Sequence, residues 1–268
     1  MQQYYPSVKN AIGLLLRLFL IVVVLTIPFL VIRIFLNQDE QFASLTAYLV
    51  VVPVVLAEIW LIGFAVRRIK ATEGFRLSDQ FRIRAYHFAP FALLSTLALD
   101  FLLQPVEQLI PVSSSFEQIF HQLMNHRILA ALHIILLGPV LEEIIFRGII
   151  LRGFLKNYHP VKAIVISSLL FGIIHLNLSQ LVAAFIIGCF IGFIYWQTRS
   201  LFLCILIHIV NNGIAFIFIW KFGFNISPDQ LINSTPVYLV LYMCAALLFS
   251  FGLFQIYKNS DRKTEESF

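Results

Sequence analysis

Long apolar runs separated by short polar segments constrain the fold of this chain more than any other feature. A helix needs about 20 apolar residues to cross the hydrocarbon core of a bilayer. We count about eight such runs, at residues 11–36, 43–66, 86–106, 128–151, 161–177, 180–197, 201–220 and 236–257. The sequence therefore predicts an all-α fold, a polytopic bundle of about eight transmembrane helices.

Composition supports the same class. Hydrophobic residues make up 60% of the 268 residues, and charged residues only 12%. Soluble domains carry about 25% charged residues, so this chain has too few polar groups to cover a water-facing surface. The polar stretches are also too short for a core of their own. We expect one transmembrane domain over 1–268, integral to the lipid bilayer.

Basic residues gather in alternate loops and thereby set an orientation. Lys and Arg follow the second, fourth, sixth and eighth runs, as at Arg67, Lys156, Arg199 and Lys258, while the loops between are acidic or nearly uncharged. Cytoplasmic loops carry the excess of Lys and Arg, so we expect both termini in the cytosol. The short loops and tail indicate a bacterial plasma membrane.

The remaining composition excludes two classes of function. The net charge of +5 lies between apolar runs and accompanies no nucleic-acid-binding motif, so we expect no nucleic-acid partner. The three cysteines, Cys189, Cys204 and Cys244, lie inside apolar runs and form no CxxC pair. They predict neither a disulfide framework nor a zinc ribbon.

Ionisable residues inside membrane spans are costly, so each is a candidate functional residue. The candidates are Glu58, Asp100, His133, Glu142, Glu143, His175 and His208. We interpret His133 as structural. Glu58 and Asp100 are expected to pair with polar partners or to reach an interface, with a place along a substrate path as the alternative.

The fourth run contains two adjacent carboxylates, Glu142 and Glu143. Successive helical side chains point about 100° apart, so the two face different surroundings. Glu143 and Arg147 are spaced i, i+4 and can pair, which leaves Glu142 without a local cation and suited to be a general base. Pro139, one turn earlier, is expected to kink the helix. The alternative is a charged helix end whose carboxylates both reach interfacial water.

Two later runs each carry a histidine in an i, i+4 pair, Phe171 with His175 and His208 with Asn212. A carboxylate, two imidazoles and a carboxamide from three spans could converge and activate a water for hydrolysis. Packing and interhelical hydrogen bonding are the alternatives. Counted along upright helices, His175 lies roughly 20 Å deep and the other groups roughly 10 Å, so convergence requires tilt, a kink or a short fifth helix.

The three motifs, Glu142–Glu143–x–x–x–Arg147, Phe171–x–x–x–His175 and His208–x–x–x–Asn212, together resemble the CPBP family of CAAX prenyl proteases and bacteriocin-processing enzymes. The resemblance covers roughly residues 128–220, which would be the catalytic core, and implies an eight-helix bundle. It implies that Glu142 and His175 activate water, that Glu143 and Arg147 support them, and that His208 and Asn212 hold the oxyanion. Phe171 would line the substrate cavity.

Metal dependence stays open at this stage. Glu142, His175 and His208 could ligate Zn²⁺ or another divalent ion. No helix carries an HExxH motif, which argues against a conventional zinc protease. We favour water activation without a tightly bound metal.

The function expected from these residues is that of an intramembrane endopeptidase, a CAAX-protease-like hydrolase acting on a membrane-associated or lipidated peptide. The first alternative is a non-catalytic membrane protein that binds a peptide or gives immunity to a bacteriocin. A transporter with a proton path through Glu58, Asp100 and Glu142 ranks last, because no inverted repeat is visible.

Overall fold

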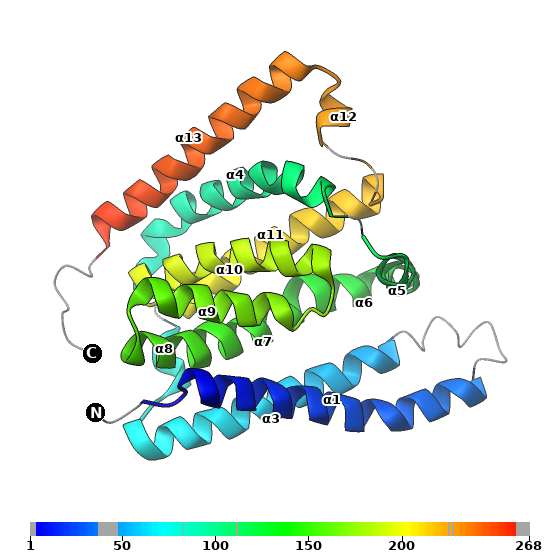
Figure 1. Ribbon diagram of the computed structural model, residues 1–268, viewed down its shortest axis with the longest axis vertical. Coiled ribbons are helices and arrows are strands. Elements are labelled where there is room, and N and C mark those ends of the chain that lie inside the picture. Colours follow the sequence, from blue (N-terminus) through cyan, green and yellow to red (C-terminus); the bar gives the residue numbers. More distant parts are fainter. Residues whose placement is uncertain are drawn as a thin grey trace.

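The computed structural model describes residues 4–36, 48–81, 83–110, 112–224, 226 and 228–260, and these residues form helices and connections with no strand among them (Figure 1). The predicted all-α class is thus confirmed. The longer helices are α1 (Val8–Leu36), α3 (Tyr48–Glu73), α4 (Ala89–Gln108), α9 (Pro160–Ile173), α10 (Leu178–Thr198), α11 (Leu201–Phe222) and α13 (Thr235–Asn259). Shorter helices are η1 (Leu77–Gln80), η2 (Ile83–Phe88), α5 (Ser114–Met124) and α12 (Pro228–Ile232).

The fourth predicted span is one continuous helix, Arg127–Asn157, in which two π-helical stretches interrupt the α-helix. In chain order its parts are α6 (Arg127–Ala131), π-helical η3 (Leu132–Leu137), α7 (Gly138–Glu143), π-helical η4 (Ile144–Leu151) and α8 (Arg152–Asn157). π-Helical turns are rare and often occur at functional sites. Because Arg127–Asn157 carries the Glu142, Glu143 and Arg147 motif, we call it the motif helix.

Six helices in the described part of the chain are long and apolar enough to cross a membrane. They are Val8–Ile32, Ala85–Gln108, Arg127–Asn157, Leu178–Thr198, Leu201–Phe222 and Thr235–Asn259. Helices α3 and α9 occupy the other two predicted ranges but are not among the six, and α9 has only 14 residues. The protein is a multi-pass integral membrane protein, and the cytosolic placement of its termini stays a prediction.

The boundary of the fifth predicted span, 161–177, was wrong. Helix α9 ends at Ile173, so His175 lies in the turn that follows and not on the helix. Leu176 has a left-handed φ of 53°, which ends the helical path. The side chain of Asn177 then accepts from the backbone N–H of Ser179 at 3.2 Å and caps α10.

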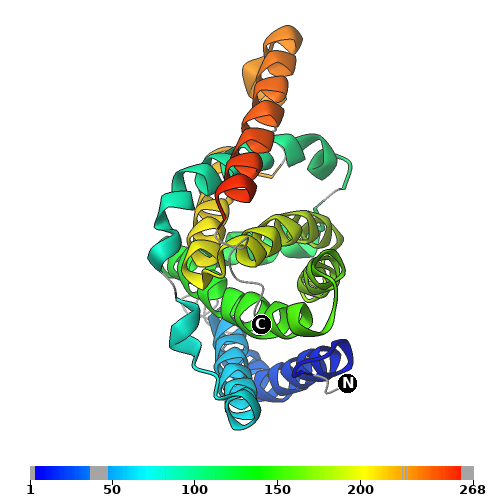
Figure 2. The ribbon, with the colours of Figure 1, turned by 90° about the vertical axis from the view of Figure 1, so that its left-hand side faces the viewer.

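Helices α9 and α10 lie side by side and form a tightly packed pair (Figures 1 and 2). A Cβ placed on Gly172 would lie 2.7 Å from the backbone oxygen of Leu181, and one on Gly188 would lie 3.1 Å from Cβ of Ser168. Small residues let membrane helices approach this closely. The close approach places the backbone of α10 beside the motif helix.

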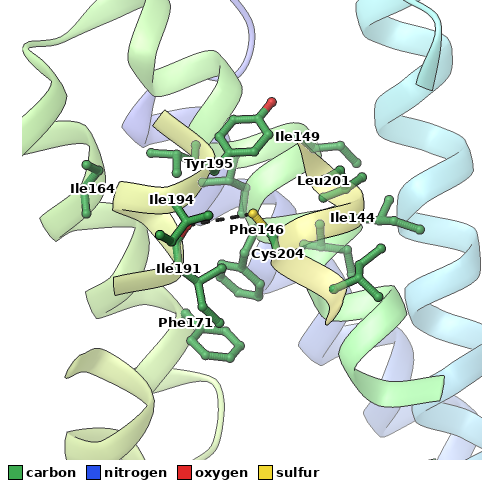
Figure 3. Close-up of a cluster of buried hydrophobic side chains, with 14 of the residues drawn as sticks. Ile144, Phe146, Ile149, Ile164, Phe171, Ile191, Ile194, Tyr195, Leu201 and Cys204 are labelled. Atoms are coloured by element: carbon green, nitrogen blue, oxygen red, sulfur yellow. Dashed lines mark hydrogen bonds between the residues drawn. The ribbon is translucent and has the colours of Figure 1, made fainter. Parts of the chain in front are cut away.

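Residues of this pair belong to a single large apolar core, and Figure 3 shows part of that core. Phe146, Phe171, Ile191, Ile194 and Cys204 meet there, and Cys204 Sγ lies 3.8 Å from the carbonyl oxygen of Ile191, to which it donates. Cys204 is fully buried and Phe171 nearly so. Cys189, Cys204 and Cys244 are free cysteines, and Cys204 is the buried one of the three.

The N-terminal hairpin α1–α3 lies along one side of the motif helix (Figure 1). At its end Glu73 Oε2 accepts from Arg152 at 3.0 Å and from Lys156 at 2.7 Å. These two bonds fix the end of α3 to α8. They hold α3, which carries Glu58, against the helix that carries Glu142.

Helix α5, in a segment expected to be a loop, is amphipathic. Ser113 caps it by accepting from Phe116 N–H at 3.3 Å, and Phe120 packs against Phe216 and Phe224. Its apolar residues lie on one face, which suits a helix at the membrane–water interface. It contributes to a second, smaller core.

Candidate active site

Glu143 is the centre of a buried polar network inside the bundle. Its Oε1 accepts from Nη1 of Arg147 at 2.7 Å, the predicted i, i+4 pair, and both side chains are almost completely buried. Arg147 Nη2 also donates to the carbonyl oxygen of Gly188 at 3.2 Å, and the guanidinium lies 4.7 Å from the centre of the Phe171 ring. A buried charge pair is tolerated when further hydrogen bonds satisfy it, and Arg147 meets that condition.

His208 joins the network from α11. Its Nδ1 lies 2.8 Å from Oε1 of Glu143, the same oxygen that Arg147 contacts. A carboxylate salt-bridged to arginine only accepts hydrogen bonds, so the proton in this contact lies on Nδ1 of His208. The imidazole is therefore oriented, with Nε2 directed away from Glu143.

Glu142 faces this free nitrogen. Its Oε2 lies 3.7 Å from Nε2 of His208, and 22% of its side chain is exposed whereas Glu143 has none exposed. The two adjacent carboxylates thus have different surroundings, as the 100° step between them predicted. Glu142 is the accessible carboxylate, and Glu143 is the buried one that holds His208.

Two further ionisable groups lie near Glu142. Glu58 on α3 and His133 on η3 both interact electrostatically with its charge. Glu58 is buried, and Nδ1 of His133 is buried without a hydrogen-bond partner among the described residues. Sequence reasoning marked both as costly in a membrane but did not place either beside Glu142, because no local spacing connects them.

Asn212 donates through Nδ2 to the backbone oxygen of Ile134, at 2.9 Å, on the motif helix. Its Oδ1 accepts from Asn211 Nδ2 at 3.1 Å. Asn212 therefore takes part in interhelical hydrogen bonding, and its expected role at the oxyanion stays a prediction. Sequence reasoning missed the backbone acceptors at Ile134 and Gly188, which have no side-chain signal.

His175 reaches the network only through Phe171. Its Nδ1 lies 2.9 Å from the carbonyl oxygen of Phe171, and its ring lies edge-on to the Phe171 ring at 5.1 Å. The same ring packs edge-on against His208 at 5.7 Å. Within the described residues, His175 forms no hydrogen bond or ion pair with Glu142 or His208. The structure thus brings Glu142, Glu143, Arg147, Phe171 and His208 together, with His175 in contact with Phe171 alone among these five.

The side chains do not fit a metal ion as placed. No three His, Cys, Asp or Glu side chains in the described part of the chain are grouped so that they could hold one. This applies to the set Glu142, His175 and His208 among the others. Asp100, the remaining candidate, lies on α4, where its Oδ2 is buried without a hydrogen-bond partner among those residues.

Comparison with known proteins gives two matches to this region. Residues 124–214 match the family model of the type II CAAX prenyl endopeptidase Rce1-like proteins. A Bacillus subtilis (strain 168) protein named "Putative membrane peptidase YdiL" is 36% identical over 77 residues, which are 29% of this chain and 32% of that protein. The chain thus matches about a third of that relative's length. No solved structure matches the chain. The segment that matches the Rce1-like family model, 124–214, carries the buried network and all three motifs.

Proposed function

We propose that this protein is an intramembrane endopeptidase that hydrolyses a peptide bond in a membrane-associated or lipidated peptide, using water activated by Glu142. One observation supports this most directly. Glu143, held by Arg147, accepts from Nδ1 of His208 and leaves Nε2 beside the partly exposed carboxylate of Glu142. A base next to an oriented imidazole is the arrangement that acid–base hydrolysis requires.

In the proposed reaction Glu142 takes a proton from a water molecule as the water oxygen attacks the scissile carbonyl carbon. The oxyanion that forms accepts a hydrogen bond from Nε2–H of His208, whose Nδ1 contacts Glu143. Collapse of this intermediate breaks the C–N bond, and Glu142 returns the proton to the leaving amine nitrogen. Groups oriented beforehand, as His208 is by Glu143, stabilise developing charge most effectively.

In this proposal, Nε2 of His175 forms a hydrogen bond with the attacking water. Because the carbonyl of Phe171 can only accept, Nδ1 of His175 carries the proton in their 2.9 Å contact. Nε2 is then the nitrogen left for water or substrate. Phe171, which contacts both imidazoles, would form the wall of the substrate cavity.

The proposal assigns no step to a metal, because the donor side chains do not form a ligand set. The substrate would reach a site surrounded by apolar helices, in which Glu142 is the partly exposed carboxylate. A peptide anchored in the bilayer meets this requirement better than a soluble protein. The match to a CAAX endopeptidase family model is consistent with that class of substrate.

The test is cleavage by purified protein in liposomes that carry membrane-anchored and prenylated peptides, with products identified by mass spectrometry. Glu142→Gln keeps the size of the side chain and removes the base, so cleavage should fall about 100-fold or more. Asp100→Asn, another acid in a span but outside the network, is the matched control and should retain activity. Unchanged cleavage by the Glu142→Gln protein would remove the proposal and favour a peptide-binding or immunity protein.

A further inference from the structure

We propose that Asn212 is a positioning residue that closes a gap made by Pro139 in the backbone of the motif helix, and so holds Glu142 against His208. The inference rests on the proposed function only in its activity readout. Proline at position 139 cannot make the backbone hydrogen bond that another residue would make there.

The gap follows from the π-helical register before Pro139. In a π-helix the N–H of residue i bonds to the carbonyl of residue i−5, and Gly138 N–H does so with His133. In the same register the next donor, residue 139, would bond to the carbonyl of Ile134. Proline has no N–H, so the carbonyl of Ile134 has no backbone donor from position 139.

The Asn212 side chain occupies that acceptor. Its Nδ2 lies 2.9 Å from the Ile134 oxygen, a normal N–H···O distance, although 78 residues separate the two. Because the Ile134 carbonyl can only accept, the nitrogen of the Asn212 amide faces it, and Oδ1 is left to accept from Asn211. Inside a bilayer no water can replace a missing partner, so an unpaired carbonyl is strongly unfavourable.

This bond joins the two helices that carry the reacting groups. Asn212 lies one turn after His208 on α11, and Ile134 lies eight residues before Glu142 on the motif helix. The 3.7 Å contact between Glu142 and His208 spans the same pair of helices. Asn212 therefore sets the separation and register of the two helices, and the contact between Glu142 and His208 depends on both.

A rescue experiment separates this role from direct contact with substrate. Asn212→Leu keeps the size of the side chain and removes the donor. Pro139→Ala supplies a backbone N–H at position 139, which bonds to the Ile134 carbonyl in the π register; in an α register the N–H of Gly138 bonds to that carbonyl instead. We expect Asn212→Leu to lower the melting temperature by about 3 °C and cleavage roughly 10- to 100-fold. The double variant should return to within about twofold of the Pro139→Ala protein in cleavage, with a matching melting temperature.

The control is His208→Ala, which Pro139→Ala should not rescue because it removes a reacting group. A double variant as inactive and as unstable as Asn212→Leu would overturn the proposal, and so would Asn212→Leu with the wild-type melting temperature. If Asn212→Leu does not fold, recovery of folded protein in the double variant supports the proposal, and its failure to recover counts against it. The melting temperatures do not depend on cleavage, so they decide the matter even if the wild-type protein proves inactive.

Discussion

Nδ1 of His208 lies 2.8 Å from Oε1 of Glu143, although 65 residues separate them in the chain. Arg147 donates to the same oxygen and extends the network to the backbone of Gly188 on α10. One carboxylate thus connects the motif helix with α11, and its arginine partner reaches a third helix.

The two adjacent glutamates should differ in their effect on stability. Glu143→Gln leaves Arg147 buried beside a neutral group, and breaking a buried pair costs about 3–5 kcal/mol. Glu142 is partly exposed and forms no pair of that kind, so Glu142→Gln should leave the melting temperature nearly unchanged. Thermal unfolding in detergent measures both, and equal losses would contradict the assignment of Glu143 as the buried support.

Arg147→Lys should destabilise the protein although it keeps the charge. Arginine donates here to Glu143 and Gly188 from one planar group and lies over Phe171, which a lysine ammonium cannot reproduce. We expect a loss of about 1.5–3 kcal/mol in thermal unfolding. Arg17→Lys is the control, because its guanidinium lies over one ring, that of Phe64. A wild-type melting temperature for Arg147→Lys would show that charge alone suffices.

Packing of α9 against α10 should not tolerate a methyl group at Gly172. The added Cβ would lie 2.7 Å from the backbone oxygen of Leu181, so the helices must separate, at a cost of about 1–3 kcal/mol. Gly63→Ala is the matched control. Its Cβ would meet only Arg67 Nη2 at 3.8 Å, and alanine favours helix by about 1 kcal/mol over glycine. Opposite signs are expected in the two unfolding measurements.

The contacts of Glu73 should weaken with salt. Arg152 and Lys156 both bond to it and are only partly exposed, so Glu73→Gln should lower stability by about 1 kcal/mol or more at low ionic strength. Screening should narrow the difference from wild type in 1 M salt. Glu117, whose partner His121 is 3.8 Å away and well exposed, is the control and should show no effect at either salt concentration. A difference that does not change with salt would assign Glu73 a packing role instead.

The sequence alone determined the fold class and the local pairings. Apolar runs of membrane-spanning length predict helices wherever they occur, since a backbone in lipid must satisfy its own hydrogen bonds. The i, i+4 spacing of Glu143 and Arg147 likewise predicts contact from helix geometry alone. The three motifs indicated which parts of the chain would carry the candidate site. These features depend on neighbours a few residues apart, and the chain order contains that information.

Only the tertiary structure decided which groups meet. His208 contacts the second glutamate, Asn212 bonds to the Ile134 carbonyl, and His175 lies in a turn because α9 ends at Ile173. The count of helical depth assumed upright helices of full length, and a 14-residue helix does not satisfy it. Backbone acceptors such as Ile134 and Gly188 have no residue type that marks them. Their availability depends on local register and on the helices that pack beside them, and hence on the folded chain as a whole.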